Sequence, residues 1–163
     1  MDSNLSLTLG FKGQLKLSAQ AVPLQEGYLK LGGIVDATNQ STGLKFGVVV
    51  SAPSDDPTAI VAGAGSGNII RGISVFDDAV AQNAPAHPDK YLAGEPCSFV
   101  TKGLVKIQSW ETGKDPVIGY KVQFADATGA IGFVASSADA SHTLLDGAKV
   151  VEVTDDGAYV WLA

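Results

Sequence analysis

The chain has 163 residues, of which 45% are hydrophobic and 17% are charged, so it is long enough to bury one ordinary core. Its formal net charge of −6 argues against nucleic acid as a partner, because neutralising phosphates requires clustered Lys and Arg. The same charge disfavours an anionic membrane surface, and the longest apolar run, residues 46–50, is far too short to span a bilayer.

Short runs that alternate apolar and polar residues dominate the chain, and residues such as Gly, Asn, Ser and Asp separate them. In chain order, the main runs are residues 5–9, 14–17, 28–31, 45–50, 98–100, 104–107, 120–124, 131–134, 149–153 and 158–162. This spacing predicts an all-β fold, a single antiparallel β-barrel or β-sandwich domain with little helix. Because no long linker interrupts the runs, we expect one domain over residues 1–163, with residues 1–10 as a possible N-terminal arm.

The turns between these runs can be assigned from their residue types. Asp155, Asp156 and Gly157 lie between the last two runs and predict a β-hairpin. Residues 126–129 predict a second hairpin in the same way, and residues 111–116 form a longer loop. Around residues 63–67, closely spaced glycines could suggest a phosphate-binding loop. The residues that follow form a strand pattern instead of a helix, so we interpret this stretch as a turn.

Residues 76–91 form the most unusual segment, because two prolines, Pro85 and Pro88, accompany the paired acids Asp77 and Asp78. An aspartate there could cap a short helical turn over residues 77–83. Asp77 and Asp78, with His87 and Asp89, could also form a hard-ligand metal cluster. Adjacent strand residues point to opposite faces, however, so capping is the better interpretation.

The sequence has no catalytic signature. We therefore predict that the protein is not an enzyme and binds no cofactor and no metal. Cys97 is the single cysteine, which excludes an intrachain disulfide and a Cys-based zinc site, and its apolar surroundings favour a core position. His87 and His142 lack a nearby G-x-S-x-G nucleophile motif. Trp110 and Trp161 could form a stacking platform for a sugar, but each ends a strand-like run and favours packing.

Two consecutive stretches resemble a known family. Residues 75–91, VFDDAVAQNAPAHPDKY, and residues 92–107, LAGEPCSFVTKGLVKI, are similar to sequences of tailed-bacteriophage capsid cement or decoration proteins. In that family a short G-E/D-x-v motif leads into a strand, a glycine turn and another strand. The resemblance lies mainly in residues 71–107, with a looser match over residues 115–162.

The resemblance implies a non-enzymatic virion protein on the outside of the capsid. Such proteins cluster as trimers at threefold or local threefold positions, bridge neighbouring major capsid protein subunits and stabilise the expanded head. No nucleic acid, membrane or small-molecule substrate is implied. The N-terminus lacks the basic and apolar regions of a secretory signal, so we expect synthesis in the host bacterial cytoplasm.

We hypothesise that the unusual segment forms part of a subunit or capsid contact, because prolines lower the entropy lost on docking. The proposed contact residues are Phe76, Asp77, Asp78, His87, Pro88, Asp89 and Tyr91. Alternatively, the segment only packs against its own domain. Two other functions fit a small acidic β protein: a phage tail or baseplate component, and a carbohydrate-binding β-sandwich module.

Overall fold

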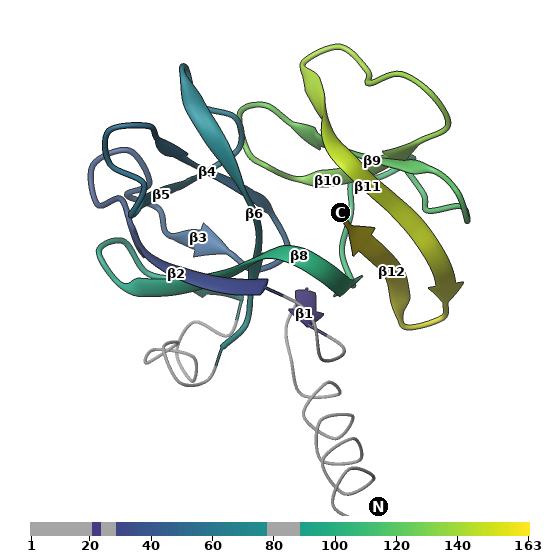
Figure 1. Ribbon diagram of the computed structural model, residues 1–163, viewed down its shortest axis with the longest axis horizontal. Coiled ribbons are helices and arrows are strands. Elements are labelled where there is room, and N and C mark those ends of the chain that lie inside the picture. Colours follow the sequence, from purple (N-terminus) through teal and green to yellow (C-terminus); the bar gives the residue numbers. More distant parts are fainter. Residues whose placement is uncertain (1–20, 24–28, 78–88) are drawn as a thin grey trace, which may run out of the picture.

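The computed structural model describes residues 21–23, 29–77 and 89–163, and regular structure within these ranges is entirely β (Figure 1). The prediction of an all-β fold is therefore confirmed. The strands are β1 (Ala21–Pro23), β2 (Leu29–Val35), β3 (Leu44–Lys45), β4 (Val49–Pro53), β5 (Ala59–Ala62), β6 (Asn68–Val75), β7 (Lys90–Tyr91), β8 (Pro96–Ile107), β9 (Lys121–Ala125), β10 (Ile131–Val134), β11 (His142–Thr154) and β12 (Gly157–Leu162).

Five strands close into a barrel in the order β8-β2-β5-β4-β6, because β6 also pairs with β8. The pairs around this barrel are antiparallel, as expected, except that β2 and β5 run parallel, with Ile34 opposite Ala59. A second sheet, in the order β10-β9-β11-β12-β8, continues from the same β8 strand. In Figure 1 the barrel lies on the left and this C-terminal sheet on the right.

Strand β8 belongs to both sheets. Its first half pairs with β2 and β6, whereas residues 103–107 pair with β12. The expectation of two strands separated by a glycine turn is wrong here, because Pro96–Ile107 is one continuous strand. Gly103 has a φ of 111°, a conformation that residues with a side chain rarely adopt. It allows the strand to change partners without ending.

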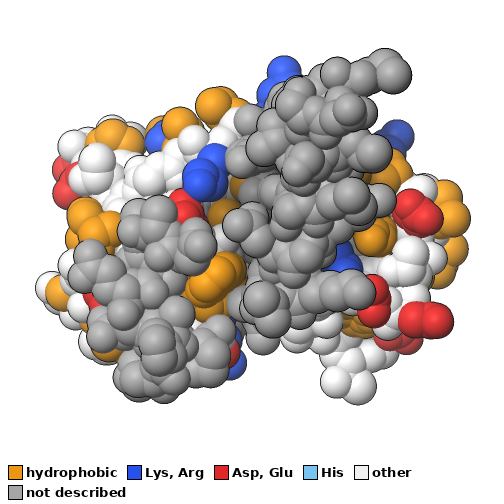
Figure 2. All heavy atoms as spheres, turned by 90° about the horizontal axis from the view of Figure 1, so that it is seen from below, with side chains coloured by type: hydrophobic (Ala, Val, Ile, Leu, Met, Phe, Trp, Pro, Cys, Tyr) orange, Lys and Arg blue, Asp and Glu red, His pale blue; other side chains and the backbone are white. Residues whose placement is uncertain are grey.

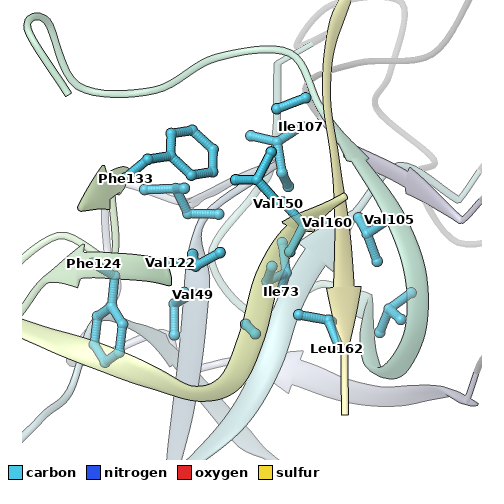
Figure 3. Close-up of a cluster of buried hydrophobic side chains, with 14 of the residues drawn as sticks. Val49, Ile73, Val105, Ile107, Val122, Phe124, Phe133, Val150, Val160 and Leu162 are labelled. Atoms are coloured by element: carbon cyan, nitrogen blue, oxygen red, sulfur yellow. The ribbon is translucent and has the colours of Figure 1, made fainter. Parts of the chain in front are cut away.

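Two apolar cores result from this arrangement. One fills the barrel and includes Val50 and Phe99, whereas the other lies between the barrel wall and the C-terminal sheet and includes Val49 and Val100. Successive strand residues point to opposite faces, so a barrel strand covered on both sides contributes to both cores. Figure 3 shows the second core, to which the barrel contributes Val49 and Ile73.

The hairpin joining β9 to β10 attaches the C-terminal sheet to the barrel. The backbone N–H of Val49 donates to the carbonyl of Gly129 (2.8 Å), and that of Ala64 donates to the carbonyl of Asp126 (2.8 Å). A Cβ on Gly129 would lie 2.3 Å from the Val49 oxygen, and its φ of 72° also favours glycine. The glycine-rich stretch at residues 63–67 is a turn before strand β6, as predicted.

The turn residues predicted two hairpins correctly, whereas one run expected to be a single strand is divided in two. The predicted hairpin at Asp155 and Asp156 pairs Thr154 with Gly157, and the hairpin at residues 126–129 is also formed. The run at residues 45–50, expected to be one strand, is divided between β3 and β4. Gly47, with a φ of 76°, bends the chain there, and its N–H donates to the carbonyl of Ser74 (2.8 Å).

Candidate functional site

The described residues on either side of 78–88 are held next to each other. Strand β6 ends at Val75, and β7 begins at Lys90 and pairs with β3. The hydroxyl of Tyr91 donates a hydrogen bond to the carbonyl of Val75 (2.7 Å), which joins the two ends directly. Asp78, His87, Pro88 and most of the predicted helical turn lie outside the described residues.

Phe46, between β3 and β4, supports both ends of the segment. Phe76 meets its ring edge to face, with ring centroids 5.5 Å apart, and Tyr91 does the same at 4.8 Å. Such T-shaped contacts are the favoured geometry of aromatic pairs. The N–H of Phe46 also donates to the carbonyl of Asp89 (3.1 Å). Of the proposed contact residues, Phe76 is therefore half-buried against the barrel core.

Tyr91 requires a correction to the contact hypothesis. Its side chain is 0% exposed and forms part of the barrel core. Burial raises the pKa of the Tyr91 phenol well above its usual value, so the hydroxyl remains a hydrogen-bond donor. A side chain without exposed surface cannot touch a partner in this fold, and its role is to hold the ends of the segment. The sequence pattern did not show this, because the short β7 strand gives no periodic signal.

Asp77 is also largely committed within the molecule. Its Oδ2 accepts hydrogen bonds from the Ser98 hydroxyl (2.9 Å) and from the Lys30 ammonium group (2.5 Å). The Asp77 side chain is 11% exposed and that of Lys30 is 36% exposed. The carboxylate therefore fastens the start of the segment to the outer faces of β8 and β2. The role of the Asp77 side chain shown by these contacts is to hold the described start of the segment against the barrel.

Exposed residues nevertheless lie at Asp89 and along β2, the strand that carries Lys30. Asp89 is exposed immediately before β7. On β2, Leu29 and Ile34 are 47% and 45% exposed, and Ile34 lies on the same outward face as Lys30. Figure 2 views the molecule from the side of β2 and β8 and shows hydrophobic side chains among charged ones on the described part of this face. Sequence reasoning missed Ile34, whose alternation with Leu31 and Val35 could have revealed an outward apolar residue.

The other candidates from the sequence are mainly structural. Cys97 is 1% exposed in the barrel core, as predicted, and burial raises the pKa of its thiol to about 12. Trp110 packs edge to face on Phe133 and donates to Asp115 (3.0 Å). Trp161, expected to be packed, is instead 42% exposed.

His142 forms part of a polar network on the outer side of the C-terminal sheet. Its Nε2 lies 2.7 Å from the Glu111 carboxylate, and its Nδ1 lies 2.8 Å from the Ala140 carbonyl. Nearby, Asp139 pairs with Lys114 and accepts a hydrogen bond from Gln123 (2.7 Å). These contacts hold the loop before β9 against the sheet.

Neither a three-residue metal-binding cluster nor a membrane-spanning helix is present within the same described ranges. No group of three or more His, Cys, Asp or Glu side chains there could hold a metal ion. No helix in the described part of the chain has the length and apolar character needed to cross a membrane.

Comparison with known families identifies the protein class. The family model described as "Structural cement protein (E217 gp24/Pam3 gp6)" matches residues 2–163. The chain belongs to the phage structural cement protein family. A search of the curated proteins found no match. Family membership confirms the resemblance noted in residues 71–107 and extends it over nearly the whole cement protein. It is therefore a structural component of a phage virion.

Proposed function

We propose that this cement protein binds the outside of a bacteriophage capsid and stabilises the expanded head. The observation that carries the proposal is the family match over residues 2–163. A protein that binds the expanded lattice and not its precursor adds its binding free energy to the stability of the particle. Contacts of modest area, repeated over many copies, then sum to a large resistance to disruption. The partner is the major capsid protein, and no cofactor or reaction is required.

The proposed capsid-contact surface consists of residues 76–89 and the adjoining outer face of β2. Two kinds of observation support this assignment: the segment is fixed at both ends, and its neighbouring surface has apolar and charged groups. The Tyr91 to Val75 hydrogen bond and the Asp77 to Ser98 hydrogen bond fix the places where the segment leaves and rejoins the barrel. Fixed ends and two internal prolines reduce the conformational entropy that docking removes. The exposed Ile34 adds apolar surface to the face of β2 that carries Lys30, the partner of Asp77.

The proposed assembly is a homotrimer at threefold or local threefold positions, which bridges neighbouring capsid subunits. A closed cyclic arrangement lets each copy use the same surfaces, so one sequence satisfies every contact. The acidic character of the chain, with a net charge of −6, favours a capsid surface that carries basic side chains.

Co-sedimentation of the purified protein with expanded empty heads tests this proposal. The variant Asp78→Ala/His87→Ala/Asp89→Ala removes polar groups of the contact surface. Asp77 and Tyr91 are left intact because both hold the fold around the segment. The matched control removes three exposed acidic residues of the C-terminal sheet, Asp146, Glu152 and Asp155. That control keeps the number of substitutions while leaving the contact surface unchanged.

The wild type and the control should bind heads saturably, in many copies per particle, and raise the temperature at which the heads rupture. The contact variant should bind at least about tenfold more weakly, which corresponds to the loss of a few polar contacts. If the contact variant binds heads as tightly as the wild type, the capsid contact lies on another surface. A folded wild type that binds no head would contradict the proposed function and favour a tail or baseplate role.

A further inference from the structure

A row of four side chains crosses the C-terminal sheet on its outer face. The strand registers place Lys121 of β9 opposite Lys149 of β11, Lys149 opposite Trp161 of β12, and Trp161 opposite Leu104 of β8. Residues directly opposite each other in neighbouring strands lie on the same face of a sheet. Val122, Val150 and Val160, which alternate with this row, point into the core instead. We call these four residues the Lys–Trp row.

The row is open to solvent. Trp161 is 42% exposed, both lysines are exposed and Leu104 is half-buried. An exposed tryptophan on a rigid sheet, flanked by cations, has the composition of a binding hot spot, because Trp buries a large area at a low cost in side-chain entropy. A tryptophan that only packed within its own sheet would be covered, as Trp110 is by Phe133.

The charges of the row are unfavourable in the isolated molecule. Lys121 and Lys149 are like charges placed directly opposite each other, an arrangement that destabilises a sheet. The ion pairs formed among the described residues engage Lys30, Lys106, Lys114 and His142, and neither lysine of the row. Two unneutralised cations beside an exposed Trp, in a chain with a net charge of −6, fit a partner that presents carboxylates.

The chain itself carries such a group. Asp55 and Asp56 are adjacent and exposed in the loop between β4 and β5, on the barrel. The Asp56 Oδ1 accepts hydrogen bonds from the Thr58 N–H (3.2 Å) and hydroxyl (2.7 Å), which orders the loop before any contact forms. In Figure 1 the barrel and the C-terminal sheet form opposite sides of the molecule. The acidic loop and the Lys–Trp row can therefore belong to one contact only in different copies.

We propose that the Lys–Trp row binds the Asp55–Asp56 loop of a second copy of this chain. Because the two surfaces differ, the contact is head to tail, and a rotation that closes it generates a ring. The inference rests on the proposed homotrimer and assigns the surfaces that join its subunits. It uses residues other than those of the proposed capsid-contact surface, which consists of residues 76–89 and the outer face of β2. When the oligomer closes, the charged groups of Lys121 and Lys149 and the indole of Trp161 become buried.

Sedimentation equilibrium of the full chain, at low and at high salt, tests the contact. Wild type should self-associate, and salt should weaken the association. Trp161→Ala should weaken it by about thirtyfold or more, the effect of losing a hot-spot residue. Lys121→Glu/Lys149→Glu and Asp55→Lys/Asp56→Lys should each abolish the oligomer. The quadruple variant combines both charge reversals, keeps the net charge of −6 and should restore the oligomer.

The matched control is Lys45→Glu/Lys90→Glu, a second pair of opposed lysines, on β3 and β7, without an exposed tryptophan beside it. It should associate as the wild type does. Circular dichroism establishes that each variant is folded. A wild type that remains monomeric, or a folded quadruple variant that does not associate, overturns the inference. Head co-sedimentation separates the two proposals: a wild type that forms the ring but binds no head would refute capsid binding and leave the subunit contact standing.

Discussion

Removing one hydroxyl group, by Tyr91→Phe, tests whether the barrel core holds the ends of the contact segment. The Tyr91 side chain is 0% exposed, and its hydroxyl donates to the Val75 carbonyl at 2.7 Å. Phenylalanine keeps the ring and its edge-to-face contact with Phe46, so the substitution removes only the polar contacts of the hydroxyl, with the Val75 carbonyl and with Ser98. It leaves the Val75 carbonyl without that donor in a buried position.

The expected loss of stability follows from the cost of a buried polar group that loses its partner, about 1–3 kcal/mol. Taking the middle of that range, about 2 kcal/mol, the thermal midpoint of a chain of this length should fall by roughly 4–8 °C. Tyr91→Leu also removes the aromatic pair with Phe46 and should cost more than Tyr91→Phe. The measurement is urea unfolding followed by circular dichroism, with thermal unfolding as a second readout.

Tyr159→Phe is the matched control, because Tyr159 lies on the half-exposed outer face of β12 and no hydrogen bond to its hydroxyl is formed by the described residues. It should change stability by less than about 0.5 kcal/mol. If Tyr91→Phe and Tyr159→Phe unfold at the same urea concentration as the wild type, the reasoning is wrong and the Val75 carbonyl does not depend on Tyr91. Reduced head binding by Tyr91→Phe, with the fold intact, would connect this bond to the capsid contact.

Three further results are expected. Gly129→Ala should destabilise the protein by about 2 kcal/mol or more in urea unfolding, because the added Cβ would lie 2.3 Å from the Val49 carbonyl oxygen and the φ of 72° favours glycine. Gly113 has a similar φ of 79° but open space where a Cβ would lie, so Gly113→Ala should cost less. Cys97, buried and with a thiol pKa raised to about 12, should react with a thiol reagent only at the rate of unfolding, and rapid labelling of the native protein would contradict its burial. Hydrogen bonding to the Ala140 carbonyl and to Glu111 raises the pKa of His142, so its stabilising contribution is complete below pH 6.5 and is lost as the pH rises through the higher folded-state pKa. His142→Gln should therefore remove the decline in thermal midpoint above that pH, and an unchanged pH profile would refute the assignment.

Local sequence signals determined the parts of this protein that depend on a few neighbouring residues. Asp155 and Asp156 specify a tight hairpin, because turn chemistry acts within four residues. The alternating runs set the all-β class, and the apolar surroundings of Cys97 placed it correctly in the core. The stretch at residues 71–107 was enough to indicate the cement family.

The tertiary structure decided which strands pair and therefore which side chains are available to a partner. Closure of the barrel through β6 and β8, and the division of β8 between two sheets, bring together residues far apart in sequence. Closure of the barrel buries Tyr91 and engages Asp77 with Ser98. The pairing of β11 with β9 and with β12 aligns Lys121, Lys149 and Trp161 in one exposed row. Strand register is selected by the total burial of many side chains, and a shift of one residue would move each of them to the other face. A linear pattern cannot contain that choice, because every alternating run is compatible with several partners.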